Sequence, residues 1–186
     1  MQTRRSFIQR VTTLLGALAV SGSAMFLTAC GNVAQSIITA FQGILKILAQ
    51  AGVLTNQPII MAVTSALDAV LGAVTAYANA PAADKTSFGL QLALAIQLAQ
   101  AQLQTFWNSL SLGGPVAIVV EGLLTVLLST LAGFLPPLPV PPANEEVQRA
   151  MALPRHIPYT PQVRSDKQFR HDINVVCAQN SMKPIF

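Results

Sequence analysis

Apolar residues recur every three or four positions between Val33 and Ala51, a spacing that places side chains on one face of a helix. Val33, Ile37 and Phe41 begin this apolar face, and Leu48 ends it. Polar residues occupy positions 35, 39, 42, 46 and 50, away from that face. The pattern predicts an amphipathic helix with one buried side.

The same periodicity predicts two further helices. Residues 58–80 combine a broad apolar stripe with a narrow polar line, in which Asp68 is the only charge. Residues 84–110 carry an apolar stripe from Phe88 to Leu110. The opposite face of that helix carries amides, namely Gln91, Gln97, Gln100, Gln104 and Asn108. We expect this outer face to contact water, another helix or a sugar-rich surface.

Residues 116–135 are apolar on almost every side, with Glu121 as their only charge. A helix of this kind is normally either buried or membrane-spanning. Short connections between the segments favour antiparallel neighbours. The predicted fold class is therefore all-α, a small antiparallel bundle of about four helices over residues 30–135. In the alternative, residues 58–80 and 116–135 cross a bilayer, with Asp68 and Glu121 facing a polar seam.

The chain changes character after the fourth segment. Five of the seven residues from Pro136 to Pro142 are proline, which blocks helix and sheet pairing and favours polyproline II. We interpret residues 136–142 as a stiff spacer, or alternatively as a strap across the bundle. Residues 143–186 are predicted to hold a short helix to about Leu153, followed by an irregular, basic, partly disordered tail. The alternative is an arm that docks on a partner, an anionic lipid headgroup or the cell wall.

The first 29 residues have the three parts of an export signal. Arg4, Arg5 and Arg10 form a basic start without an acid, and the apolar stretch that follows is short for a transmembrane helix. The next four residues are those of a lipobox-like motif, Leu27, Thr28, Ala29 and Cys30.

This motif resembles the lipobox of bacterial lipoproteins, which implies cleavage of residues 1–29 and acylation of Cys30 with a diacylglyceryl group and palmitate. The stretch containing Arg4, Arg5 and Phe7 resembles a twin-arginine signal, which implies export of an already folded protein. Gly31 after the acylated cysteine would, by resemblance to sorting rules in diderm bacteria, permit transfer to the outer membrane. The alternative is an uncleaved membrane helix at the amino end.

Charge and chemistry narrow the functional classes. The net charge is +4, but three of the eleven basic residues lie in the signal, which leaves eight against seven acids. This balance gives no indication of nucleic-acid binding. His156, His171, Asp172 and Cys177 match no recognised catalytic or metal-ligand spacing, so we predict no enzyme, no metal and no cofactor. Cys177 is interpreted as a half-buried small hydrophobe, with an intermolecular disulfide or a reactive thiol as alternatives.

The sequence therefore predicts a lipoprotein of the cell envelope, on the periplasmic face of a membrane or in the outer membrane. Its partners would be the bilayer, through acylated Cys30, and an envelope protein or the cell wall. We expect a binding or scaffolding module. The alternatives are a membrane-active or pore-forming helical lipoprotein and a carrier of an apolar ligand.

Overall fold

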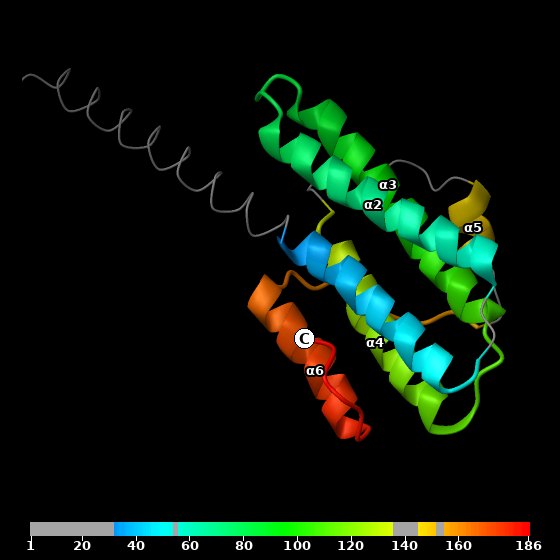
Figure 1. The fold of residues 1–186 in the computed structure, drawn as a ribbon. Helices are drawn as coiled ribbons and strands as arrows, with labels where there is room; N and C mark the ends of the chain where they lie inside the picture. The colour runs from blue at the N-terminus through cyan, green and yellow to red at the C-terminus, as the bar shows by residue number, and fades with distance from the viewer. Residues whose placement is uncertain (1–31, 54–55, 136–144, 152–154) are drawn as a thin grey trace, which may run out of the picture.

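The computed structural model describes residues 32–53, 56–135, 145–151 and 155–186 (Figure 1). All regular secondary structure in these residues is helical, so the all-α class is confirmed. The predicted signal and the spacer at 136–142 lie outside the described residues. In chain order the elements are the helix Asn32–Gln50, α2 (Gln57–Asn79), α3 (Lys85–Ser109), α4 (Gly114–Gly133), α5 (Glu145–Met151) and α6 (Asp166–Gln179).

The helix boundaries follow from local chemistry. α2 has a proline in its first turn and ends at Asn79, because Ala80 precedes Pro81 and adopts extended backbone. α4 also has a proline in its first turn. α6 begins at a true cap, since the Ser165 hydroxyl accepts a hydrogen bond from the backbone N–H of Gln168 at 3.2 Å.

One apolar core joins the long helices. α2 and α3 lie side by side along their length, and α4 contacts both α3 and α6 (Figure 1). The predicted apolar face of the helix Asn32–Gln50 is buried, and its Phe41 ring meets the Phe106 ring of α3 edge to face at 5.2 Å. α4 supplies five fully buried leucines at positions 123, 124, 127, 128 and 131, because it has α3 on one side and α6 on another.

The predicted amide face of α3 does not point outward as a whole. Gln91 is exposed, but Gln97, Gln100 and Gln104 are buried. The reason is that α5 and the segment after Pro154 cover this side of α3. Of the contacts expected for this face, water is wrong for these three glutamines, whereas another helix, α5, does cover this side of α3.

The prediction of an irregular, partly disordered tail is also wrong for residues 155–186. Fourteen of them form α6, which buries Phe169, Ile173 and Cys177 in the common core. The preceding segment adds Ile157 to the same core. These four apolar side chains supply the hydrophobic driving force that holds residues 155–186 against the long helices.

Candidate functional site

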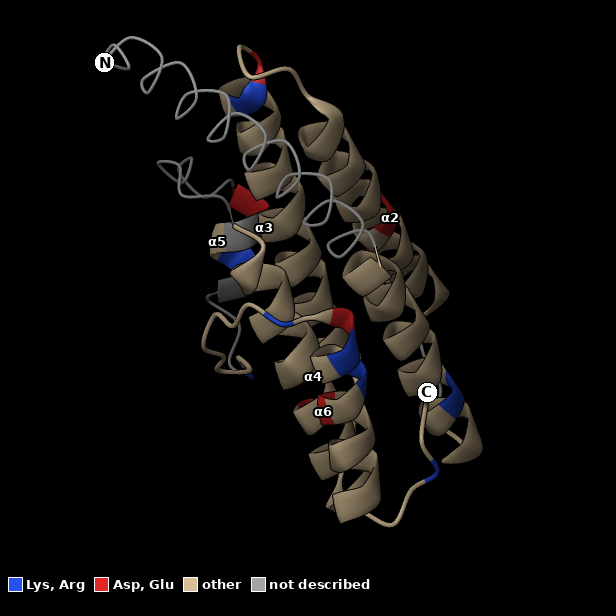
Figure 2. Cartoon of the chain, turned by 90° about the vertical axis from the view of Figure 1, so that its left-hand side faces the viewer, with Lys and Arg blue, Asp and Glu red and all other residues tan. Residues whose placement is uncertain are grey.

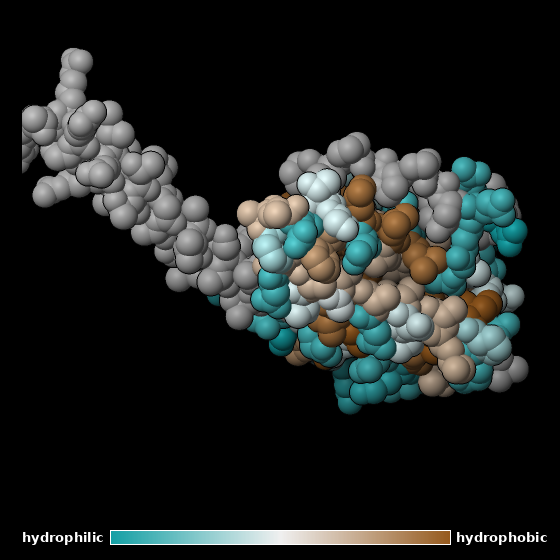
Figure 3. Space-filling view, turned by 90° about the horizontal axis from the view of Figure 1, so that it is seen from above, coloured by the Kyte–Doolittle hydropathy of each residue, from teal (hydrophilic) through white to brown (hydrophobic). Residues whose placement is uncertain are grey.

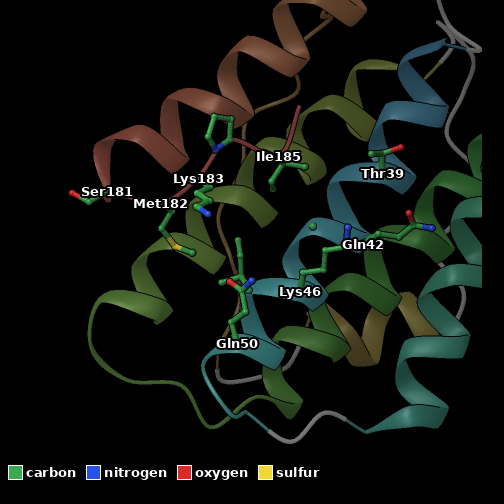
Figure 4. Close-up of a pocket in the computed structure, with 11 residues that line it drawn as sticks. Thr39, Gln42, Lys46, Gln50, Ser181, Met182, Lys183 and Ile185 are labelled. Carbon is green, nitrogen blue, oxygen red and sulfur yellow. The ribbon is translucent and has the colours of Figure 1, made fainter.

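A groove lies between the helix Asn32–Gln50 and residues 181–185, which follow α6 (Figure 4). Its volume is about 470 Å³, within the range typical of small-molecule sites. The groove is lined on the helix side by Thr39, Gln42, Gly43, Lys46, Ile47 and Gln50, and on the other side by Ser181, Met182, Lys183, Pro184 and Ile185.

The far wall of the groove is set by the way α6 ends. Ser181 adopts the left-handed conformation, with φ of 55°, and the chain reverses there. The N–H of Met182 donates to the Cys177 carbonyl at 2.9 Å, and the N–H of Ser181 donates to the Ala178 carbonyl at 3.1 Å. These two bonds form a Schellman motif, usually built on glycine, which turns residues 182–186 back along α6.

Asn174 holds the returning segment in place. Its side-chain oxygen accepts the N–H groups of Ile185 and Phe186 at 3.1 and 3.2 Å, and its amide donates to the Phe186 carbonyl at 3.0 Å. On the helix side, Gly43 permits close approach, because a Cβ there would lie 2.7 Å from the Ile185 Cδ1. The wall is therefore fixed both by hydrogen bonds and by packing.

Two lysines line the groove, and no acidic side chain of the described residues does. Lys46 extends from the helix and Lys183 from the returning segment, and both are exposed (Figure 4). In the described part of the chain neither lysine makes an ion pair. Charged residues are otherwise sparse on the helices and recur on α5 and α6 (Figure 2).

A second groove, of about 310 Å³, lies where residues 158–164 cross α4. Arg164 anchors this crossing: it donates to Asp172 at 2.7 Å and to the hydroxyls of Ser129 and Thr130 at 2.7 and 3.0 Å. Its side chain is only 7% exposed. Because these contacts, with Asp172, Ser129 and Thr130, are all within the protein, we interpret this arginine as a structural anchor and not as a ligand-binding group.

The sequence-predicted site residues lie elsewhere. Arg4, Arg5 and Phe7 of the export signal and Leu27, Thr28, Ala29 and Cys30 of the lipobox fall outside the described residues. The described chain starts at Asn32, two positions after Cys30. Neither groove was predicted, because each forms where a tail segment packs against a helix that is distant in the sequence. The separation is more than a hundred positions in the first groove and about thirty in the second.

The structure does not assemble the candidate catalytic groups. Cys177 is fully buried, and not half-buried as expected from its apolar neighbours. Burial raises the pKa of its thiol, and a backbone hydrogen bond at Ile185 lowers it. Asp172 is engaged by Arg164, and His171 is exposed. Asp68 and Glu121 are both exposed, on α2 and α4. Within the described ranges, no cluster of three His, Cys, Asp or Glu side chains is placed to hold a metal ion.

No protein-family model, curated protein or solved structure matches this chain.

Proposed function

We propose that this chain is a cell-envelope lipoprotein in which acyl chains on Cys30 hold a helical body at a membrane surface, where it acts as a binding or scaffolding module. The observation that carries the proposal is the Leu27-Thr28-Ala29-Cys30 motif after a short apolar stretch and a basic start. Only Gly31 separates Cys30 from the helix Asn32–Gln50. Such a short tether would keep the body close to the lipid headgroups.

We further propose that the helix Asn32–Gln50, α2, α3 and α4 form an antiparallel bundle, with residues 136–142 as a proline-rich spacer. The shared core of these helices supports the bundle. On the face seen in Figure 3, hydrophobic and hydrophilic residues are interspersed, as expected of a face that contacts water.

Metabolic labelling tests the anchor. We expect palmitate to enter the wild-type chain in its native host and to be absent from Cys30→Ala, while Cys177→Ala, the matched control at the second cysteine, labels normally. Intact mass should show loss of residues 1–29 only in chains that carry Cys30. Equal labelling of Cys30→Ala, or an unmodified full-length wild-type chain, would contradict the proposal.

The export route and the final membrane are tested separately. Replacing both Arg4 and Arg5 by lysine should leave precursor in the cytoplasm, if the twin-arginine route is used. In a diderm host, Gly31→Asp should move the lipoprotein from the outer to the inner membrane fraction. Unchanged fractionation of either variant would remove the corresponding part of the proposal.

A membrane-active lipoprotein is the second candidate. It is favoured by one observation: Asn32–Gln50, α2 and α4 are each long and apolar enough to cross a membrane. Dye release from liposomes at low protein concentration would support it. Lipid that co-purifies with the chain would instead favour a carrier of apolar ligands.

A further inference from the structure

We propose that the groove between the helix Asn32–Gln50 and residues 181–185 binds an organic phosphate, with Lys46 and Lys183 contacting the phosphate and the apolar side chains that line the groove contacting the organic part. This inference deepens the proposed function, on which it rests, by naming the ligand class of the binding module. It is carried by the charge, the lining and the construction of the groove.

Two lysine side chains line the groove. Lys46 and Lys183 approach from opposite walls, and among the described residues no Asp or Glu lines the groove. The nearest acids along α6 are already engaged, because Asp166 accepts from Arg170 and Asp172 accepts from Arg164. A lysine ammonium group has three donors and suits phosphate oxygens. Two such groups across one groove favour a doubly charged anion over a monoanion.

The same groove offers contacts for an uncharged part. Ile47, Met182 and Ile185 are half-buried or buried and line the same groove as the two lysines. Gln42 and Gln50 add amide donors and acceptors. A ligand with a short apolar or glyceryl part therefore gains contacts that inorganic phosphate lacks.

The position of the groove along the helix leaves two sources for such a phosphate. Lys46 follows Asn32 by fourteen residues, which is about 21 Å of helix. A free phosphate ester reaches the groove in any orientation of the body. A phospholipid headgroup reaches it only if the helix lies along the membrane, so the test must separate the two sources.

Lysine acylation mapped by mass spectrometry provides the test. The wild-type chain, as purified from its host, is reconstituted in phosphatidylcholine vesicles and acylated with and without hexyl phosphate, inorganic phosphate or hexanol. We expect hexyl phosphate to slow the acylation of Lys46 and Lys183 several-fold, inorganic phosphate to slow it less, and hexanol not at all. Lys167 is exposed on the first turn of α6 and serves as the internal control, with no change.

Vesicles that contain phosphatidylglycerol form the second arm. If these vesicles slow the acylation of Lys46 and Lys183 and hexyl phosphate does not, the bound phosphate is that of a lipid headgroup. If hexyl phosphate slows it and these vesicles do not, the bound phosphate is a free ester. Protection in neither arm, equal protection by hexanol, or equal slowing at Lys167 overturns the proposal.

Variants check that the protection comes from this groove. Lys46→Gln and Lys183→Gln should each abolish protection of the remaining lysine, whereas Lys167→Gln should retain protection of both. All three side chains are exposed, so folding is not at risk. Repeating the experiment on the full chain with Cys30→Ala distinguishes failure of this inference from failure of the proposed anchor. Protection that persists without acylation shows phosphate binding without the anchor, and acylated Cys30 without protection shows the anchor without phosphate binding.

Discussion

At the scale of single residues, the pair of Arg164 and Asp172 fixes α6 to the segment before it. The Asp172 side chain is 28% exposed and the Arg164 side chain 7% exposed. Asp172→Asn would leave the buried guanidinium without its counter-charge, so we expect a loss of about 3 kcal/mol in the free energy of unfolding. Urea denaturation measures this loss.

The matched control is the exposed pair on the same helix. Arg170 is 49% exposed and donates to Asp166 at 2.9 Å, four positions earlier. Since exposed pairs contribute little, Arg170→Gln should cost no more than about 1 kcal/mol. Equal losses in the two variants would mean that burial of Arg164 has no energetic consequence.

Gly43 is the residue whose side chain must be absent for the groove to form. Gly43→Ala should destabilise the fold by about 1 to 3 kcal/mol, because the new Cβ overlaps Ile185. A second change, Ile185→Ala, should recover most of the loss attributable to that overlap. Gly72→Ala on α2 is the control: nothing lies within 4 Å of a Cβ there, so we expect stabilisation by about 0.5 to 1 kcal/mol.

The buried thiol of Cys177 predicts an alkaline dependence of stability. Its pKa is raised in the folded state by burial, so folding favours the protonated thiol. The contribution of the thiol to the free energy of unfolding is therefore fully present below the ordinary thiol pKa of about 8.5. It is lost as the pH rises through the folded-state pKa. Thermal unfolding across this range should show the fall, and Cys177→Ala should reduce it. An unchanged profile would assign the fall to another group, such as half-buried Tyr159, whose pKa is also raised by burial.

At the scale of elements, amide side chains join a helix to an extended segment. Gln104 donates to the Ile157 carbonyl and accepts its N–H, both at 3.0 Å, and Asn108 forms the same pair of bonds with the backbone of Arg155 at 2.9 and 3.2 Å. Gln104 and Asn108, four positions apart on α3, thus pair with Ile157 and Arg155, two positions apart on the extended segment. The backbone of the segment is therefore bonded at alternate residues, as it would be by a neighbouring strand.

Gln104→Ala should therefore release the segment locally. Two buried backbone groups of Ile157 would lose their partners, at a cost of about 1 to 3 kcal/mol each. We expect faster hydrogen exchange at Ile157 and faster trypsin cleavage after Arg155. Gln91→Ala, at an exposed amide of the same helix, should change neither rate.

These contacts also show where sequence reasoning reaches its limit. The long helices could be predicted because apolar periodicity is a local property: the predicted segment 58–80 corresponds to α2 and 116–135 to α4. The burial of Gln104 could not be predicted, because it depends on a segment more than fifty positions away. α6 had a detectable signal, since Phe169, Ile173 and Cys177 are spaced by four, but the charges and prolines around them outweighed it.

At the scale of the whole molecule, residues 155–186 complete the core. The long helices alone leave the α6 side of α4 without cover, since Phe169, Ile173 and Cys177 of α6 are fully buried. Ile157 is fully buried as well, bonded to Gln104 of α3. At about 2 kcal/mol for each large apolar side chain, their removal forfeits much of the 5 to 15 kcal/mol that stabilises an ordinary domain.

A chain that stops at Pro154 should accordingly lose cooperative unfolding and bind hydrophobic dyes, and it should do so even when Cys30 is acylated. Adding residues 155–186 as a separate peptide should restore a cooperative transition, because the contacts are noncovalent. The full-length Lys167→Gln chain, which retains all of these contacts, should unfold as the wild type does.

If the truncated chain unfolded with an unchanged midpoint, the tail would be an attached arm and not part of the core. A defect in envelope retention after the same truncation could then be assigned to a lost partner, whereas an unfolded truncated chain would lose retention for reasons of stability alone.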